Sequence, residues 1–213
     1  MTFNMCRAAG MTSGVAWLAL SACTPAQLQS RSASYAIIDT LSASSGAHPS
    51  DFAGSLGSDV VTMVKHTVDG QIVPQPTMVE DMGRVSMHLA LADPGTVAQP
   101  ATPSAANTVT FTRYHVAYLR ADGRNVAGLD VPFGFDGGLT FSVTGTTSVA
   151  TTFVLVRAQA KQEPPLRLLQ GGGGAQTIST ITQVTFYGAD QAGRAVAVTG
   201  TINIHFSDWA DPD

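Results

Sequence analysis

Five histidines are the side chains of this sequence best suited to acid–base chemistry or metal binding. They are His48, His66, His88, His115 and His205. Metal sites on a single element use short fixed spacings, such as two histidines four residues apart on a helix. No such spacing and no His-x-His pair occurs here, so we expect separate surface histidines, four of them on strands. A site could then form only if the fold brings several of them together across neighbouring strands.

The sequence also lacks a motif for a catalytic serine or for a pair of catalytic carboxylates. The segment Gly54-Ser55-Leu56-Gly57-Ser58 lacks the Gly-x-Ser-x-Gly spacing of a nucleophile elbow. Glycoside hydrolysis needs two carboxylates facing one sugar, but the candidate acids all lie beside turn signals, which predicts turn roles for them. These acids are Glu80, Asp81, Asp122, Asp130, Asp136 and Glu163. We therefore predict no catalytic residues and no enzyme activity.

Ligand loops give only weak signals. Gly171-Gly172-Gly173-Gly174 lacks the Lys-Ser/Thr that follows a phosphate loop, so it predicts a flexible loop tip. Asp122, Asn125 and Asp130 leave calcium binding open as an alternative, although their carboxylate density is below that of a typical calcium loop. We predict no cofactor and no metal.

The two cysteines, Cys6 and Cys23, carry the most specific chemistry in the chain. Cys23 ends the segment Leu20-Ser21-Ala22-Cys23. This segment follows a single early charge, Arg7, and the apolar run 14–20, which is too short to cross a bilayer of roughly 30 Å as a helix. These features predict a signal segment over residues 1–22.

Residues 20–23 resemble the lipobox of bacterial lipoproteins with type II signal peptides. The resemblance implies cleavage between Ala22 and Cys23, a diacylglyceryl group on the Cys23 thiol and an acylated amine. Two acyl chains anchor a protein stably. Thr24 is not the Asp associated with inner-membrane retention, which implies the outer membrane, facing the periplasm or the surface. The alternative is an ordinary secretory signal cut near Ala22.

Composition limits the partners of the mature chain. The net charge is -4, and removal of Arg7 with the signal takes it to about -5. A chain without a basic stripe is not suited to nucleic acid or anionic head groups. Membrane attachment would then depend on the lipid at Cys23, and the mature chain would have no disulfide.

The chain after residue 33 is predicted to be β-structure. Residues 23–33 have no apolar period and predict a tether. Residues 34–206 alternate short apolar runs with Gly, Asp and Pro turns, which predicts one domain. Two small subdomains remain an alternative. Asp69-Gly70 predicts a hairpin, and residues 207–213 are predicted to form an acidic tail. The expected strands lie at 35–41, 60–68, 71–73, 84–92, 108–120, 126–135, 139–143, 151–160, 177–187 and 195–206. We expect a bulge or twist near Thr112-Arg113, a loop with one helical turn over 51–58, a turn at 136–138 and an excursion loop over 161–176.

No segment keeps a helical period over three turns, so we expect an all-β fold. Short strands and long loops favour an antiparallel β-sandwich, immunoglobulin-like in shape. The sequence therefore predicts a lipid-anchored envelope lipoprotein whose β-sandwich binds or scaffolds a partner. The alternatives are a carbohydrate-binding or hydrolytic accessory domain, and an assembly subunit that offers a strand edge for β-augmentation.

Overall fold

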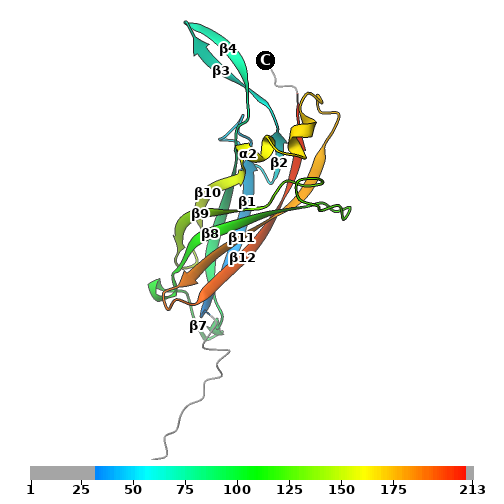
Figure 1. The fold of residues 1–213 in the computed structure, drawn as a ribbon. Coiled ribbons are helices and arrows are strands. Elements are labelled where there is room, and N and C mark those ends of the chain that lie inside the picture. The colour runs from blue at the N-terminus through cyan, green and yellow to red at the C-terminus, as the bar shows by residue number, and fades with distance from the viewer. Residues whose placement is uncertain (1–31, 210–213) are drawn as a thin grey trace, which may run out of the picture. The chain divides into compact units, whose positions relative to one another are not determined.

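The computed structural model describes residues 32–209, and this part of the chain is an all-β sandwich (Figure 1). It is 57% strand and 6% helix. The signal segment, Cys23, most of the tether and the last residues of the tail lie outside the described residues. The main strands are β1 (Ser34–Ser44), β2 (Ser55–Asp59), β3 (Thr62–Val68), β4 (Gln71–Thr77), β5 (Asp81–Leu91), β8 (Val109–Leu119), β9 (Phe135–Val143), β10 (Val149–Val156), β11 (Ile178–Asp190) and β12 (Ala195–Ser207).

Two sheets form the sandwich. The smaller has the order β1-β5-β10 and the larger the order β2-β12-β11-β8-β9. All neighbours in these sheets are antiparallel except β2 and β12, which run parallel. The predicted antiparallel sandwich is thus confirmed, with one parallel pair at the edge of the larger sheet.

The core lies between the inner faces of the two sheets. Val85, Met87 and Leu89 of β5 alternate inward and are fully buried, as their spacing in the sequence predicts. Aromatic rings join the sheets, because Phe153 of β10 packs on Tyr114 of β8 at 5.0 Å and on Phe186 of β11 at 5.2 Å between ring centroids. Such edge-on ring contacts add to the free energy of burial.

Strands β3 and β4 form a separate two-stranded ribbon that projects from the sandwich (Figure 1). The predicted turn is confirmed. Asp69 and Gly70 have φ of 51° and 77°, the left-handed conformations that a tight two-residue hairpin requires. Further short elements lie in the loops: β6 (Gly95–Thr96), β7 (Gln99–Pro100), η1 (Ala105–Asn107), α2 (Ala158–Lys161) and η2 (Leu166–Leu169).

Four local predictions are wrong. Residues 51–58 were expected to form a loop with one helical turn, but β2 begins at Ser55. The strand expected over 126–135 is a set of turns, in which the Val126 carbonyl accepts from the amides of Leu129 and Asp130. The turn expected at 136–138 lies inside β9. The strand expected over 151–160 ends at Val156 and continues into α2.

Residues 161–176 leave the sheets, as predicted, but they are not a free loop. Leu166 and Leu169 of η2 are buried in the core. Trp209 also packs back on the sandwich, with its ring beside Gly57 and Gly174 and its backbone N–H donating to Asp59 at 3.1 Å. These contacts cover one end of the larger sheet.

Candidate binding sites

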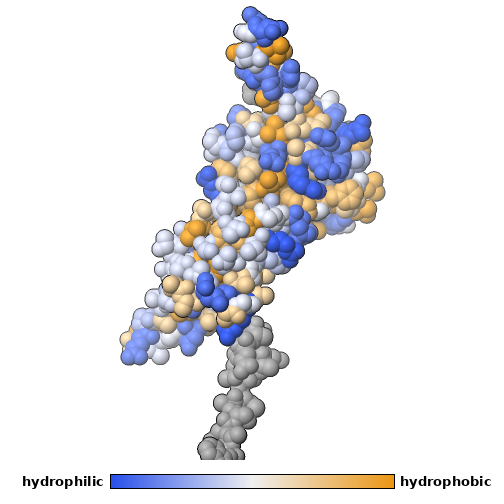
Figure 2. All heavy atoms as spheres, turned by 60° about the vertical axis from the view of Figure 1, so that its left-hand side comes forward, coloured by the Kyte–Doolittle hydropathy of each residue, from blue (hydrophilic) through white to orange (hydrophobic). Residues whose placement is uncertain are grey.

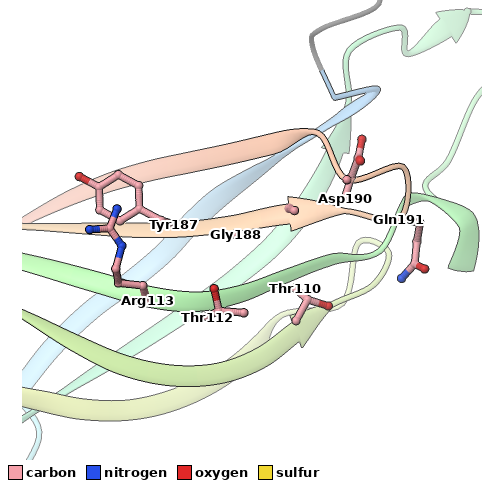
Figure 3. Close-up of a pocket in the computed structure, with 9 residues that line it drawn as sticks. Thr110, Thr112, Arg113, Tyr187, Gly188, Asp190 and Gln191 are labelled. Atoms are coloured by element: carbon pink, nitrogen blue, oxygen red, sulfur yellow. The ribbon is translucent and has the colours of Figure 1, made fainter.

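A shallow hollow of about 520 Å³ lies on the outer face of the larger sheet, between β8 and β11 (Figure 3). It arises from a bulge. In the β8–β11 register Tyr187 pairs with Arg113 and Gly188 with Phe111, so Thr112 is an extra residue on β8. A bulge near Thr112 was predicted from the sequence. Gly188 fits here because a Cβ would lie 2.3 Å from the carbonyl oxygen of Thr110.

The lining of the hollow combines a flat platform with polar groups. The Arg113 guanidinium lies 4.1 Å from the centre of the Tyr187 ring, a cation–π contact, and donates to Asp136 at 3.0 Å. Figure 3 shows the side chains of Arg113 and Tyr187 next to one another at one end of the hollow, with Gln191 at the other end. Within residues 32–209 no intramolecular hydrogen bond engages the Tyr187 hydroxyl, the Thr112 hydroxyl or the Gln191 amide, so these groups are available to a ligand.

The β3–β4 ribbon carries exposed aliphatic side chains on both faces. Met63 and Ile72 lie on one face, Val68 and Val73 on the other, and all four are at least 39% exposed. Figure 2 shows orange, apolar atoms at the surface of this projecting part. This ribbon lacks the covered face that the sandwich strands have. A two-stranded ribbon without such a face is only marginally stable in water.

The edges of the ribbon are poor templates for another strand. Val68 and Gln71 flank the turn as a hydrogen-bonded pair, so alternation along the register makes Lys65–Pro74 and Met63–Pro76 non-bonded pairs. The nitrogens of Pro74 and Pro76 therefore face the free edge of β4 and offer no N–H. Lys65 occupies the middle of the free β3 edge. Prolines and charges of this kind oppose strand addition.

The predicted histidines do not converge. His66 is exposed on the ribbon and His48 lies in the exposed loop after β1. His205 contacts the Ser179 hydroxyl at 2.8 Å, and His115 lies 3.4 Å from Asp136. Among the residues that the structure describes, no three His, Cys, Asp or Glu side chains gather as a metal site would need.

One histidine joins a polar cluster on the smaller sheet. Asp39, an extra residue at a bulge in β1, contacts His88 Nδ1 at 2.6 Å through Oδ1 and accepts the Ser148 hydroxyl through Oδ2. A catalytic triad needs the serine hydroxyl on the imidazole, with the carboxylate behind it. Here the carboxylate stands between the other two, so the cluster is not a nucleophile–base pair. The Ser148 hydroxyl first, and then His88, lower the pKa of Asp39.

The oxygens considered for calcium are engaged within the chain. Asp122 is bound by Arg120 and Arg124, which hold the pKa of its carboxyl far below the usual range. The Asn125 side-chain oxygen accepts from the Arg120 backbone, and Asp130 accepts from the Val126 backbone. These contacts are those of turn residues, the role predicted for Asp122 and Asp130.

The predicted turn role is wrong for Asp136, which lies inside β9 and pairs with Arg113, and it is wrong for Asp81. Its side chain is fully buried, with Gly46, Ser58 and Lys161 as partners, and burial raises the pKa of its carboxyl. The sequence contains a signal for this burial. Asp81 and Gly83 share the parity of Val85, Met87 and Leu89, and all five residues face inward. A carboxylate in phase with a buried stripe predicts a buried polar partner.

The lipidation site Cys23 and the cleavage residue Ala22 lie outside the described residues. In residues 32–209 no helix has the length and apolar character to cross a membrane. Comparisons with protein-family models, with curated proteins and with solved structures found no match to the chain.

Proposed function

We propose that the chain is a bacterial envelope lipoprotein whose β-sandwich domain binds or scaffolds another envelope component. The observation that carries this proposal is the segment Leu20-Ser21-Ala22-Cys23 after a short apolar run. A diacylated and N-acylated Cys23 would hold the domain durably at the membrane, in agreement with the outer-membrane location implied by Thr24.

A binding role rather than catalysis suits the described domain. The two sheets form a rigid scaffold, and an open polar hollow lies on the larger one. Among the described residues, the Ser179 hydroxyl contacts the imidazole of His205 at 2.8 Å, but no carboxylate forms an ion pair with that imidazole, so a complete Ser-His-Asp arrangement is not formed there. We therefore assign the domain recognition of a partner as its task.

The anchor is tested by Cys23→Ser in the full chain, expressed in a bacterium that processes lipoproteins. We expect the variant to lose metabolic labelling by fatty acid and to leave the membrane fraction, because a Ser hydroxyl does not replace the thiol in this modification. Cys6→Ser is the matched control and should keep both properties. Unchanged fractionation and labelling of Cys23→Ser would contradict the proposal.

Carbohydrate binding at the hollow is a second candidate. It is supported by the Tyr187 ring and the Arg113 guanidinium, which form a flat platform beside free hydroxyl and amide groups. Sugars are recognised by stacking on such faces together with hydrogen bonds to hydroxyls. A neutral or acidic envelope glycan fits this lining better than an apolar ligand.

We expect Tyr187→Ala to weaken binding to purified envelope glycans about tenfold, the effect of losing one stacking contact. Binding is measured by glycan array followed by calorimetry. Tyr35→Ala is the control, since Tyr35 is 51% exposed on the smaller sheet. Equal losses in the two variants, or no binding by the natural chain, would remove this candidate.

A further inference from the structure

Lys161 and Asp81 form a completely buried amine–carboxyl pair. Lys161 is the last residue of α2 and Asp81 the first of β5, and their side chains are 1% and 0% exposed. The Lys161 Nζ atom lies 3.0 Å from Asp81 Oδ1. This pair is separate from the hollow and from the polar cluster at Asp39.

The Lys161 amine has too few hydrogen-bond acceptors for an ammonium ion. An ammonium carries three donors, and within residues 32–209 Asp81 Oδ1 is the one acceptor that the Lys161 amine reaches by a hydrogen bond. Two N–H groups without acceptors from the chain are costly at a fully buried position. An amide nitrogen carries a single N–H and no charge, so it would suit the same position better.

The carboxyl is held by donors on both oxygens. The Gly46 backbone N–H donates to Oδ1 at 2.8 Å, and the Ser58 hydroxyl donates to Oδ2 at 2.6 Å. Burial raises the pKa of Asp81 and thus favours its protonated, electrophilic form.

We propose that Lys161 and Asp81 condense to an intramolecular amide cross-link. A proton first passes from the ammonium to the carboxylate. The neutral Nζ then attacks Cγ, the Nζ–Cγ bond forms, and the Cγ–Oδ2 bond breaks. Oδ2 leaves as water with the carboxyl proton and one proton from nitrogen, so the reaction needs no oxidant and no co-reactant.

Gly46 and Ser58, which contact the Asp81 carboxyl, each assist the condensation. The Gly46 N–H points at Oδ1, where negative charge develops in the tetrahedral intermediate, as in an oxyanion hole. The Ser58 hydroxyl contacts Oδ2 and relays the proton to the departing oxygen. The product ties α2 to β5 across 80 residues of sequence, a covalent closure made without cysteine.

The test is peptide mapping of the full chain purified from bacteria and shown to be folded by circular dichroism. A cross-link blocks trypsin after Lys161, so we expect peptide 66–84 joined to peptide 158–167, one water lighter than the two together. Lys161→Arg is the control, because a guanidinium keeps the ion pair but does not condense, and peptide 158–161 should then be released. Full recovery of unlinked 66–84 and 158–161 from the folded natural chain would overturn the proposal.

Discussion

Single carboxylates of this domain differ in what surrounds them. Asp39 and Asp122 sit at the surface in contact with hydroxyl, imidazole or guanidinium groups, which lowers their pKa. Asp81 sits in the core, where burial raises its pKa. Environment, not residue type, therefore decides which acid holds a turn and which one ties segments together.

The Asp39 cluster makes a prediction about pH. Because the pKa of Asp39 is lower in the folded chain, its contribution to stability is present above the ordinary value near pH 4 and is lost as the pH falls through the folded pKa. We expect Ser148→Ala to raise the Asp39 pKa, since that hydroxyl makes the largest contribution. Carbon NMR titration of the side-chain carboxyl measures this, with Ser142→Ala as control. An unmoved Asp39 midpoint would contradict the assignment.

At the scale of elements, alternation of apolar and polar residues predicted strands correctly, whereas glycines were an unreliable guide to turns. Strands β5, β11 and β12 and the Asp69-Gly70 turn could be predicted, because each has local alternation or a local turn signal. The part of β9 over 139–143 was predicted, but its start was not, since Gly137 looks like a turn residue. Glycine is needed at this strand position because the Tyr114 ring occupies the space where a side chain would be. Strand β2 was missed because its pairing with β12 is long-range.

The free edge of β4 in the β3–β4 ribbon is protected by two prolines. We expect the double variant Pro74→Thr, Pro76→Thr to self-associate, because it places two N–H donors on the free edge of β4. Light scattering over a concentration series should show growing dimer or aggregate, whereas the natural chain stays at one mass. Gln75→Thr is the control, since its N–H points toward β3. A double variant that remains monomeric would show that the prolines do not guard this edge.

On the scale of the whole molecule, stability depends on the contact between the sheets. Phe186 is fully buried and packs on Phe153 of the opposite sheet. We expect Phe186→Ala to lower the free energy of unfolding by about 3–5 kcal/mol, through lost burial and the cavity left behind. Urea denaturation measures it, and Tyr187→Phe, on the outer face, should change it little. A loss below about 1 kcal/mol would mean that the core closes over the missing ring.

The fold class could be predicted from the whole sequence, but the candidate sites could not. Strand count, turn chemistry and the lack of a helical period are enough for an all-β sandwich. The hollow depends on which residues of β8 and β11 stand opposite each other, and the Lys161–Asp81 pair joins residues 80 apart. Pairings of that kind are decided by tertiary packing, which a single sequence does not display.

The parallel pairing of β2 with β12 has a consequence for how the chain acquires its structure. β2 is made early, yet its neighbour in the sheet is β12, about 140 residues later in the described chain. Until β12 arrives, β2 and β11 both present open edges, and the larger sheet is divided where β12 will lie. Closure of the sandwich is therefore a late event that awaits synthesis of Ala195–Ser207, and contacts of such long range fold slowly. During that interval the partly made chain has unpaired strand edges, which are the kind of edge that pairs with other chains.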